Sequence, residues 1–83
     1  MRKIKIGSIY KHFKGNLYKV LTIAQNTETE EKMVIYVDVY SGKTWARPYD
    51  MFNSLVDKEK YPEVAQKYRF EEQNIKMEKG TDV

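Results

Sequence analysis

The chain has 83 residues, a formal net charge of +3 and no cysteine. A chain of this length forms one domain with a modest core and buries only about 60% of its unfolded surface. Without cysteine, disulfides, thiol nucleophiles and thiolate metal sites are excluded, so stability has to come from apolar packing or from oligomerisation.

The positive charge is concentrated at the start of the chain. No acidic residue precedes Glu28, whereas Lys and Arg are frequent there. Such a stretch suits phosphate, but it is more often a solvated lysine surface. No apolar run resembles a signal peptide or reaches the roughly 18 residues of a membrane span. We therefore expect a cytoplasmic protein with no membrane partner.

The first third of the chain predicts short strands. Arg2 to Ile6 alternates between polar and apolar residues, Ile9 to Phe13 alternates again, and Leu17 to Ala24 is rich in aliphatic residues. In that third segment the apolar pairs Val20-Leu21 and Ile23-Ala24 break the alternation, which predicts a bulge or burial on both faces. The polar residues from Gln25 to Lys32 predict a loop.

The most informative stretch runs from Val34 to Phe52. Its alternation predicts a β-hairpin that turns at Ser41-Gly42 and ends before Pro48. A two-residue loop places Tyr36 opposite Arg47, and a four-residue loop places Asp38 opposite Arg47. Both registers gather the same residues on one face: Tyr36, Asp38, Tyr40, Lys43, Trp45 and Arg47. The core is then expected on the other face, from Ile35, Val37, Val39 and Ala46.

The rest of the chain, from Tyr49 onward, predicts a helical turn that closes the barrel and a flexible C-terminal tail. Tyr49 to Val56 suits a helical turn that closes one end of a barrel, Pro62 suits the start of a short helix, and Tyr68 to Phe70 suits an edge strand. The predicted fold is mainly β: a small SH3-like half-open barrel of about five strands with a helical turn and a short C-terminal helix. The domain spans residues 1–70 and a charged, flexible tail spans 71–83. The residues expected to be buried are Phe13, Val20, Leu21, Ile35, Val39, Met51 and Phe52.

These segments resemble a small bacterial family known only as a domain of unknown function. The resemblance rests on Tyr10-Lys11-His12-Phe13-Lys14-Gly15-Asn16-Leu17-Tyr18-Lys19-Val20-Leu21, Thr27-Glu28-Thr29-Glu30-Glu31, Val34-Ile35-Tyr36, Trp45-Ala46-Arg47-Pro48-Tyr49-Asp50-Met51-Phe52 and Arg69-Phe70. The chain departs from the family at Asn26, where the family often has His, and at Val37, where it often has Arg or Gln. The resemblance implies a β-rich domain and no established activity.

No motif points to catalysis. The single histidine, His12, rules out a histidine cluster for metal, and the scattered glycines form no phosphate-cradling loop. An acid–base pair of His12 with Glu28 is less common in proteins than a structural hydrogen bond between such groups. We expect no enzyme, no cofactor and no metal.

The hairpin face offers a candidate binding site. Trp45 and Tyr36 suit base stacking and Arg47 suits a phosphate, with His12 and Lys14 at the rim. In the alternative, Trp45 belongs to the core and Arg47 pairs with Asp38 or Glu28. The expected function is a non-catalytic module for a nucleotide-type ligand, either a free signalling nucleotide or nucleic acid. The alternative is a protein-interaction or oligomerisation module, with another protein or a second copy as partner on the same aromatic face.

Overall fold

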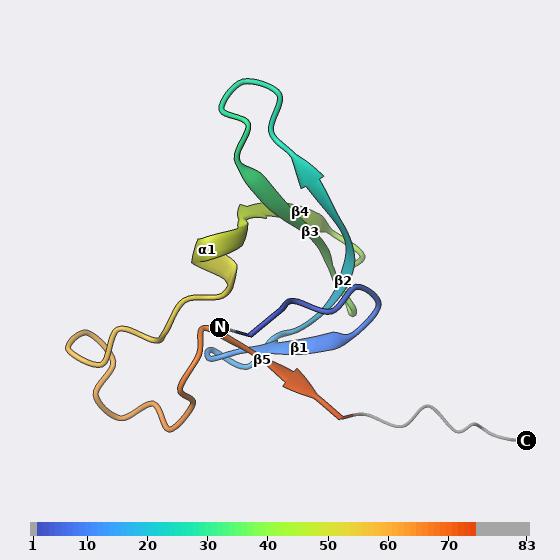
Figure 1. The fold of residues 1–83 in the computed structure, drawn as a ribbon. Coiled ribbons are helices and arrows are strands. Elements are labelled where there is room, and N and C mark those ends of the chain that lie inside the picture. The colour runs from blue at the N-terminus through green and yellow to red at the C-terminus, as the bar shows by residue number, and fades with distance from the viewer. Residues whose placement is uncertain (1, 75–83) are drawn as a thin grey trace, which may run out of the picture.

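The computed structural model describes residues 2–74, which form one curved antiparallel sheet and one short helix (Figure 1). The sheet order is β4-β3-β2-β1-β5. The elements are β1 (Ile9–His12), β2 (Leu17–Gln25), β3 (Lys32–Asp38), β4 (Thr44–Pro48), α1 (Tyr49–Phe52) and β5 (Phe70–Gln73). The fold is mainly β, as the sequence predicts, and agrees with a half-open SH3-like barrel whose edge strands are β4 and β5.

The predicted irregularity in the third strand segment is a β-bulge. In β2, Val20 pairs with Tyr36 and Thr22 pairs with Ile35, which leaves Leu21 without a partner. The extra residue shifts the alternation, so that Val20 and Ile23 both turn towards the core. Leu21, expected to be buried, is exposed because it is the bulged residue.

The β3–β4 hairpin forms with a register that differs from both predicted registers. Tyr36 lies opposite Trp45 and Val34 lies opposite Arg47. The turn begins at Asp38, whose carboxylate accepts N–H donors from Tyr40 at 2.8 Å and from Ser41 at 3.1 Å. These bonds centre the loop one residue earlier than the Ser41-Gly42 pair suggests. The N–H groups of Ser41 and Tyr40 also hold the pKa of Asp38 below its ordinary value.

The prediction of which face of the hairpin belongs to the core is wrong. Val34 and Tyr36 are buried, whereas Ile35 and Val37 on the outer face are only half-buried. Val39 lies in the loop and is exposed, as is Ala46. The aliphatic face looked the more hydrophobic, but aromatic rings fill the interior of this small barrel because each supplies more volume per position.

Four aromatic rings form the centre of the core. Phe52 and Phe70 stack with ring centroids 4.0 Å apart and planes within 5° of parallel. The edges of Tyr10 and Tyr36 pack against Phe52 at 5.4 Å and 5.2 Å. Val20 and Phe52 are buried as predicted, but Phe13 is only half-buried. Met51 is exposed because adjacent positions of a one-turn helix point in different directions.

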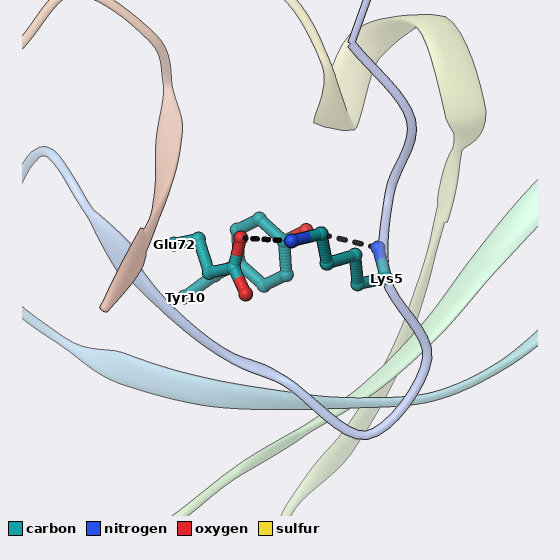
Figure 2. A network of polar contacts seen from close by, with 3 residues as sticks. All are labelled: Lys5, Tyr10 and Glu72. Atoms are coloured by element: carbon teal, nitrogen blue, oxygen red, sulfur yellow. Dashed lines mark hydrogen bonds and ion pairs between the residues drawn. The ribbon is translucent and has the colours of Figure 1, made fainter. Parts of the chain in front are cut away.

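The N-terminal segment is not a strand, contrary to its alternation. The N–H of Ile4 donates to the Tyr49 hydroxyl at 3.0 Å, and that of Lys5 donates to the Tyr10 hydroxyl at 2.9 Å (Figure 2). Side-chain acceptors therefore take the N–H groups that a sheet ladder would use. Lys5 Nζ lies 3.5 Å from a Glu72 carboxylate oxygen, and this ion pair, drawn in Figure 2, links the segment to β5.

Residues 53–69 leave the sheet after α1 and return to begin β5 (Figure 1). The helix predicted at Pro62 is absent, and turns take its place. Backbone bonds between Ser54 and Arg69 and between Val56 and Lys67 close the base of this excursion. These backbone hydrogen bonds therefore join the two ends of the excursion and do not form a helix.

The last strand begins later than predicted. β5 starts at Phe70 and continues to Gln73, so the sheet extends past residue 70. The rest of the predicted tail, residues 75–83, lies outside the described residues. Within residues 2–74 there is no helix long and apolar enough to cross a membrane.

The stacked Phe52–Phe70 pair predicts a large stability effect. Replacing Phe52, which has 0% exposure, by Ala should lower the free energy of unfolding by about 3–5 kcal/mol, because it leaves a cavity beneath three rings. The matched control is Met51→Ala on the exposed side of the same helix, with an expected loss below about 1 kcal/mol. Urea unfolding of both variants measures the difference, and similar losses would contradict this account of the core.

Candidate functional site

A basic pocket of about 320 Å³ lies where the excursion returns to the sheet. Its walls come from the end of β1 and the following turn, from β4, and from the first half and the last residue of the excursion. The lining residues are His12, Phe13, Lys14, Arg47, Val56, Asp57, Lys60, Tyr61 and Arg69. Four basic side chains face one carboxylate, an excess of three positive charges. We call this set the basic pocket.

The two arginines of the basic pocket are oriented by hydroxyl groups. Arg47 Nε donates to the Tyr36 hydroxyl at 3.1 Å, and Arg69 Nε donates to Ser54 Oγ at 3.1 Å. Neither guanidinium forms an ion pair with a carboxylate within the described residues, where Lys5–Glu72 is the only such pair. Among residues 2–74, therefore, no carboxylate occupies the terminal nitrogens of either fork. The predicted alternative, Arg47 paired with Asp38 or Glu28, does not occur.

The single carboxylate of the pocket offsets only one of these four positive charges. Asp57 Oδ1 accepts the N–H groups of Glu59 at 3.1 Å and Lys60 at 3.4 Å. These bonds hold the carboxylate against the backbone of its own turn. The pocket therefore retains a positive potential in the absence of a ligand.

His12 is held neutral inside this cluster. Burial, followed by the charges of Arg47, Arg69 and Lys14, lowers the pKa of His12 to about 4. Its Nδ1 accepts the backbone N–H of Lys14 at 3.1 Å. In the neutral ring Nε2 then carries the proton, so His12 offers a hydrogen-bond donor to the pocket.

Two aromatic rings form a further wall. The ring centroids of Phe13 and Tyr61 lie 4.8 Å apart with planes inclined at 59°. Lys14 Nζ lies 5.6 Å from the Tyr61 centroid, and Lys60 Nζ lies at the same distance from it. Both rings are half-buried, so each retains surface that a ligand can contact.

The structure gathers only part of the site predicted from the sequence. His12, Lys14 and Arg47 line the basic pocket together. Tyr36 is 4% exposed and supports Arg47 from the core instead of offering its ring to a ligand. Trp45 shares the sheet face of Tyr36 but is not part of the pocket wall; it is 43% exposed, with Lys43 Nζ 4.5 Å from its ring centroid.

Arg69, Lys60 and Tyr61 were missed in the sequence. They lie within the long excursion, which has no periodic pattern, so nothing local places them beside β1 and β4. The one usable signal is the Arg69-Phe70 pair, because an arginine next to a core aromatic has its direction fixed once that ring is buried.

A larger hollow of about 470 Å³ lies on another part of the surface. Arg2 lines this hollow, and its guanidinium already has partners within the protein. It donates to Asn53 Oδ1 and to the Phe70 carbonyl, and its Cζ lies 3.8 Å from the Tyr68 ring centroid. Burial lowers the pKa of Arg2 from its ordinary value. These contacts fasten the start of the chain to α1 and β5, so we assign this hollow a structural role.

Neither a metal centre nor an acid–base pair is visible among residues 2–74. No three His, Asp or Glu side chains come together there in an arrangement that could hold a metal ion. Glu28, the predicted partner of His12, is not among the lining residues of the basic pocket. The chemistry that the pocket offers is the recognition of an anion.

The low pKa of His12 predicts a loss of stability in acid. Between the ordinary value of 6.5 and the folded value of about 4, the unfolded chain binds a proton that the folded chain does not. The free energy of unfolding should therefore fall as the pH decreases through this range, with no His12 contribution above it. His12→Gln keeps a hydrogen-bond acceptor and should show a smaller decrease between about pH 7 and pH 5. Urea unfolding at both pH values measures this, and equal decreases would contradict the assignment.

Comparison with known proteins identifies a family without assigning an activity. No curated protein and no solved structure matches the chain significantly. Residues 8–72 match the family described as "Protein of unknown function (DUF1653)". This match includes β1 to β4, the helix α1, β5 except its last residue, and every residue of the basic pocket. The chain therefore belongs to the DUF1653 family.

Proposed function

We propose that the protein is a non-catalytic binding module for a nucleotide-type ligand whose phosphate occupies the basic pocket. The observation that carries the proposal is the pair of half-buried arginines, Arg47 and Arg69, which have no carboxylate partner among residues 2–74. Partly buried cations are normally paired, because burial removes them from water. An anionic ligand supplies the missing partner.

The geometry of the arginines suits phosphate. Each guanidinium uses Nε for a hydroxyl group of the protein, at 3.1 Å in both cases. The two remaining nitrogens of each fork match the spacing of two phosphate oxygens, which gives bidentate, charge-assisted hydrogen bonds. Because the hydroxyl groups already hold the side chains, little rotamer entropy is lost when the ligand binds.

The aromatic wall favours a nucleotide over a simple anion. Phe13 and Tyr61 lie beside the cationic groups, with Lys14 Nζ 5.9 Å and 5.6 Å from their ring centroids. A planar base can stack on such rings while its phosphate reaches the arginines. This combination of charge and aromatic surface is typical of sites for nucleotides and single-stranded nucleic acid.

A second candidate function has its own support. Tyr40, Trp45 and Val39 are exposed around the β3–β4 turn, at 81%, 43% and 42%. Exposed aromatic side chains are frequent hot spots of protein interfaces. This turn is therefore the candidate contact for a protein partner or a second copy. Salt separates the two functions, because phosphate binding weakens steeply as salt rises whereas an apolar contact does not.

The proposed function predicts a split between binding and stability at Arg47. Arg47→Lys keeps the charge but loses the fork, so the affinity for inorganic phosphate should fall about tenfold. The free energy of unfolding should change by no more than about 1 kcal/mol, the value of one hydrogen bond. NMR titration at low salt measures the affinity, and urea unfolding measures the stability.

Lys19→Gln is the matched control, because Lys19 is exposed on β2 and lies outside the pocket. This variant loses one positive charge and should bind phosphate nearly as well as the unmodified protein. If Arg47→Lys destabilised the fold and left phosphate binding intact, Arg47 would be a structural residue and the proposed function would lose its main support.

A further inference from the structure

The basic pocket concentrates its positive charge in a small volume. Arg47, Arg69, Lys14 and Lys60 surround about 320 Å³, which is at the small end of ligand pockets, roughly 300–1,000 Å³. A protein that binds a nucleic-acid strand instead spreads its basic groups along a groove, over roughly 4–16 nucleotides in an OB fold. The shape therefore favours one phosphate group with one nucleoside.

The charge of the pocket discriminates between phosphate types. Four basic side chains face one carboxylate, and that carboxylate is held by two backbone N–H groups. A phosphate monoester carries about −1.5 to −2 charges at pH 7, whereas each linking phosphate of a strand carries only one. The monoester is the better match for an excess of three positive charges.

The donors of the pocket also match a terminal phosphate. The forks of Arg47 and Arg69 and the Nε2–H of neutral His12 are all hydrogen-bond donors of residues that line one pocket. A monoester presents three acceptor oxygens to them, whereas a diester presents two and continues as a chain in both directions. The Phe13–Tyr61 wall, with centroids 4.8 Å apart, offers the base a stacking surface beside the phosphate.

We infer that the ligand of the basic pocket is a free mononucleotide with a terminal phosphate monoester, held by Arg47 and Arg69, with its base against Phe13 and Tyr61. This inference rests on the proposed function and narrows it. It selects the free nucleotide over nucleic acid, and it assigns Tyr61 as a residue that recognises the base and not the phosphate.

The test compares probes that differ in one chemical feature. Adenosine 5′-monophosphate, its methyl phosphodiester, adenosine and an octanucleotide of deoxyadenosine without terminal phosphates are titrated into the full chain by calorimetry at low salt. The monoester should bind about tenfold more tightly than its methyl diester, because the diester loses one charge and one acceptor oxygen. Adenosine should bind more weakly than both. The titrations are repeated with the uridine, guanosine and cytidine monophosphates to cover the four bases.

Tyr61→Leu supplies the second arm. Tyr61 lies in the excursion, outside the aromatic core, so the variant should keep the fold. Its affinity for adenosine 5′-monophosphate should fall at least about fivefold, while its affinity for inorganic phosphate stays unchanged. Equal losses for both probes would show that Tyr61 shapes the phosphate site, which would overturn its assignment to the base.

The outcomes separate the inference from the proposed function. If the octanucleotide or the methyl diester bound as tightly as the strongest monophosphate, and Arg47→Lys weakened it, the monoester inference would be overturned while the proposed function stood. If inorganic phosphate, every monophosphate and the octanucleotide all failed to bind, both would be overturned. Tight monoester binding that is lost in Arg47→Lys supports both.

Discussion

The stack of Phe52 on Phe70 determines where the rest of the molecule lies. These rings come from α1 and β5, and their centroids are 4.0 Å apart. To bring them face to face, the chain between them must leave the sheet and return to its far edge beside β1 (Figure 1). That return places Arg69 and Tyr61 against the end of β1. The basic pocket is therefore a consequence of how the core closes.

Tyrosine hydroxyls connect this core to the surface. Tyr10 and Tyr49 accept N–H groups of the N-terminal segment, and Tyr36 accepts Nε–H of Arg47. Each of these rings is buried or half-buried. A ring of this kind provides apolar contact and one polar group at its tip. Replacing Tyr36 by Phe would keep the packing but remove the group that orients Arg47.

The sequence predicted the strands and the helical turn more accurately than it predicted which face of each element is buried. The hairpin, the bulge after Val20 and the helical turn at Phe52 all follow from local pattern. The prediction assigned the wrong face of the hairpin to the core, because aliphatic residues suggest burial more strongly than Tyr36 does. The barrel nevertheless needs the volume of the Tyr36 ring. Arg2 to Ile6 alternates like a strand, and only the folded protein shows that tyrosine hydroxyls take its N–H groups. In the site, Arg47 was predicted, but Arg69 depends on a long-range return that no local pattern encodes.

The position of the two arginines links binding to the open side of the barrel. Arg47 lies on β4 and Arg69 immediately precedes β5, and these are the two edge strands of the sheet. No ladder joins β4 to β5 within residues 2–74. Arg47 Cζ lies 5.7 Å from the Phe70 ring centroid, so the core already brings the two edges close together there. In the proposed function, a phosphate held by both guanidinium groups would add a link across this seam and offset the repulsion between them. The proposed ligand would thus bridge the two edges that the backbone leaves unpaired, and its binding would stabilise the folded chain.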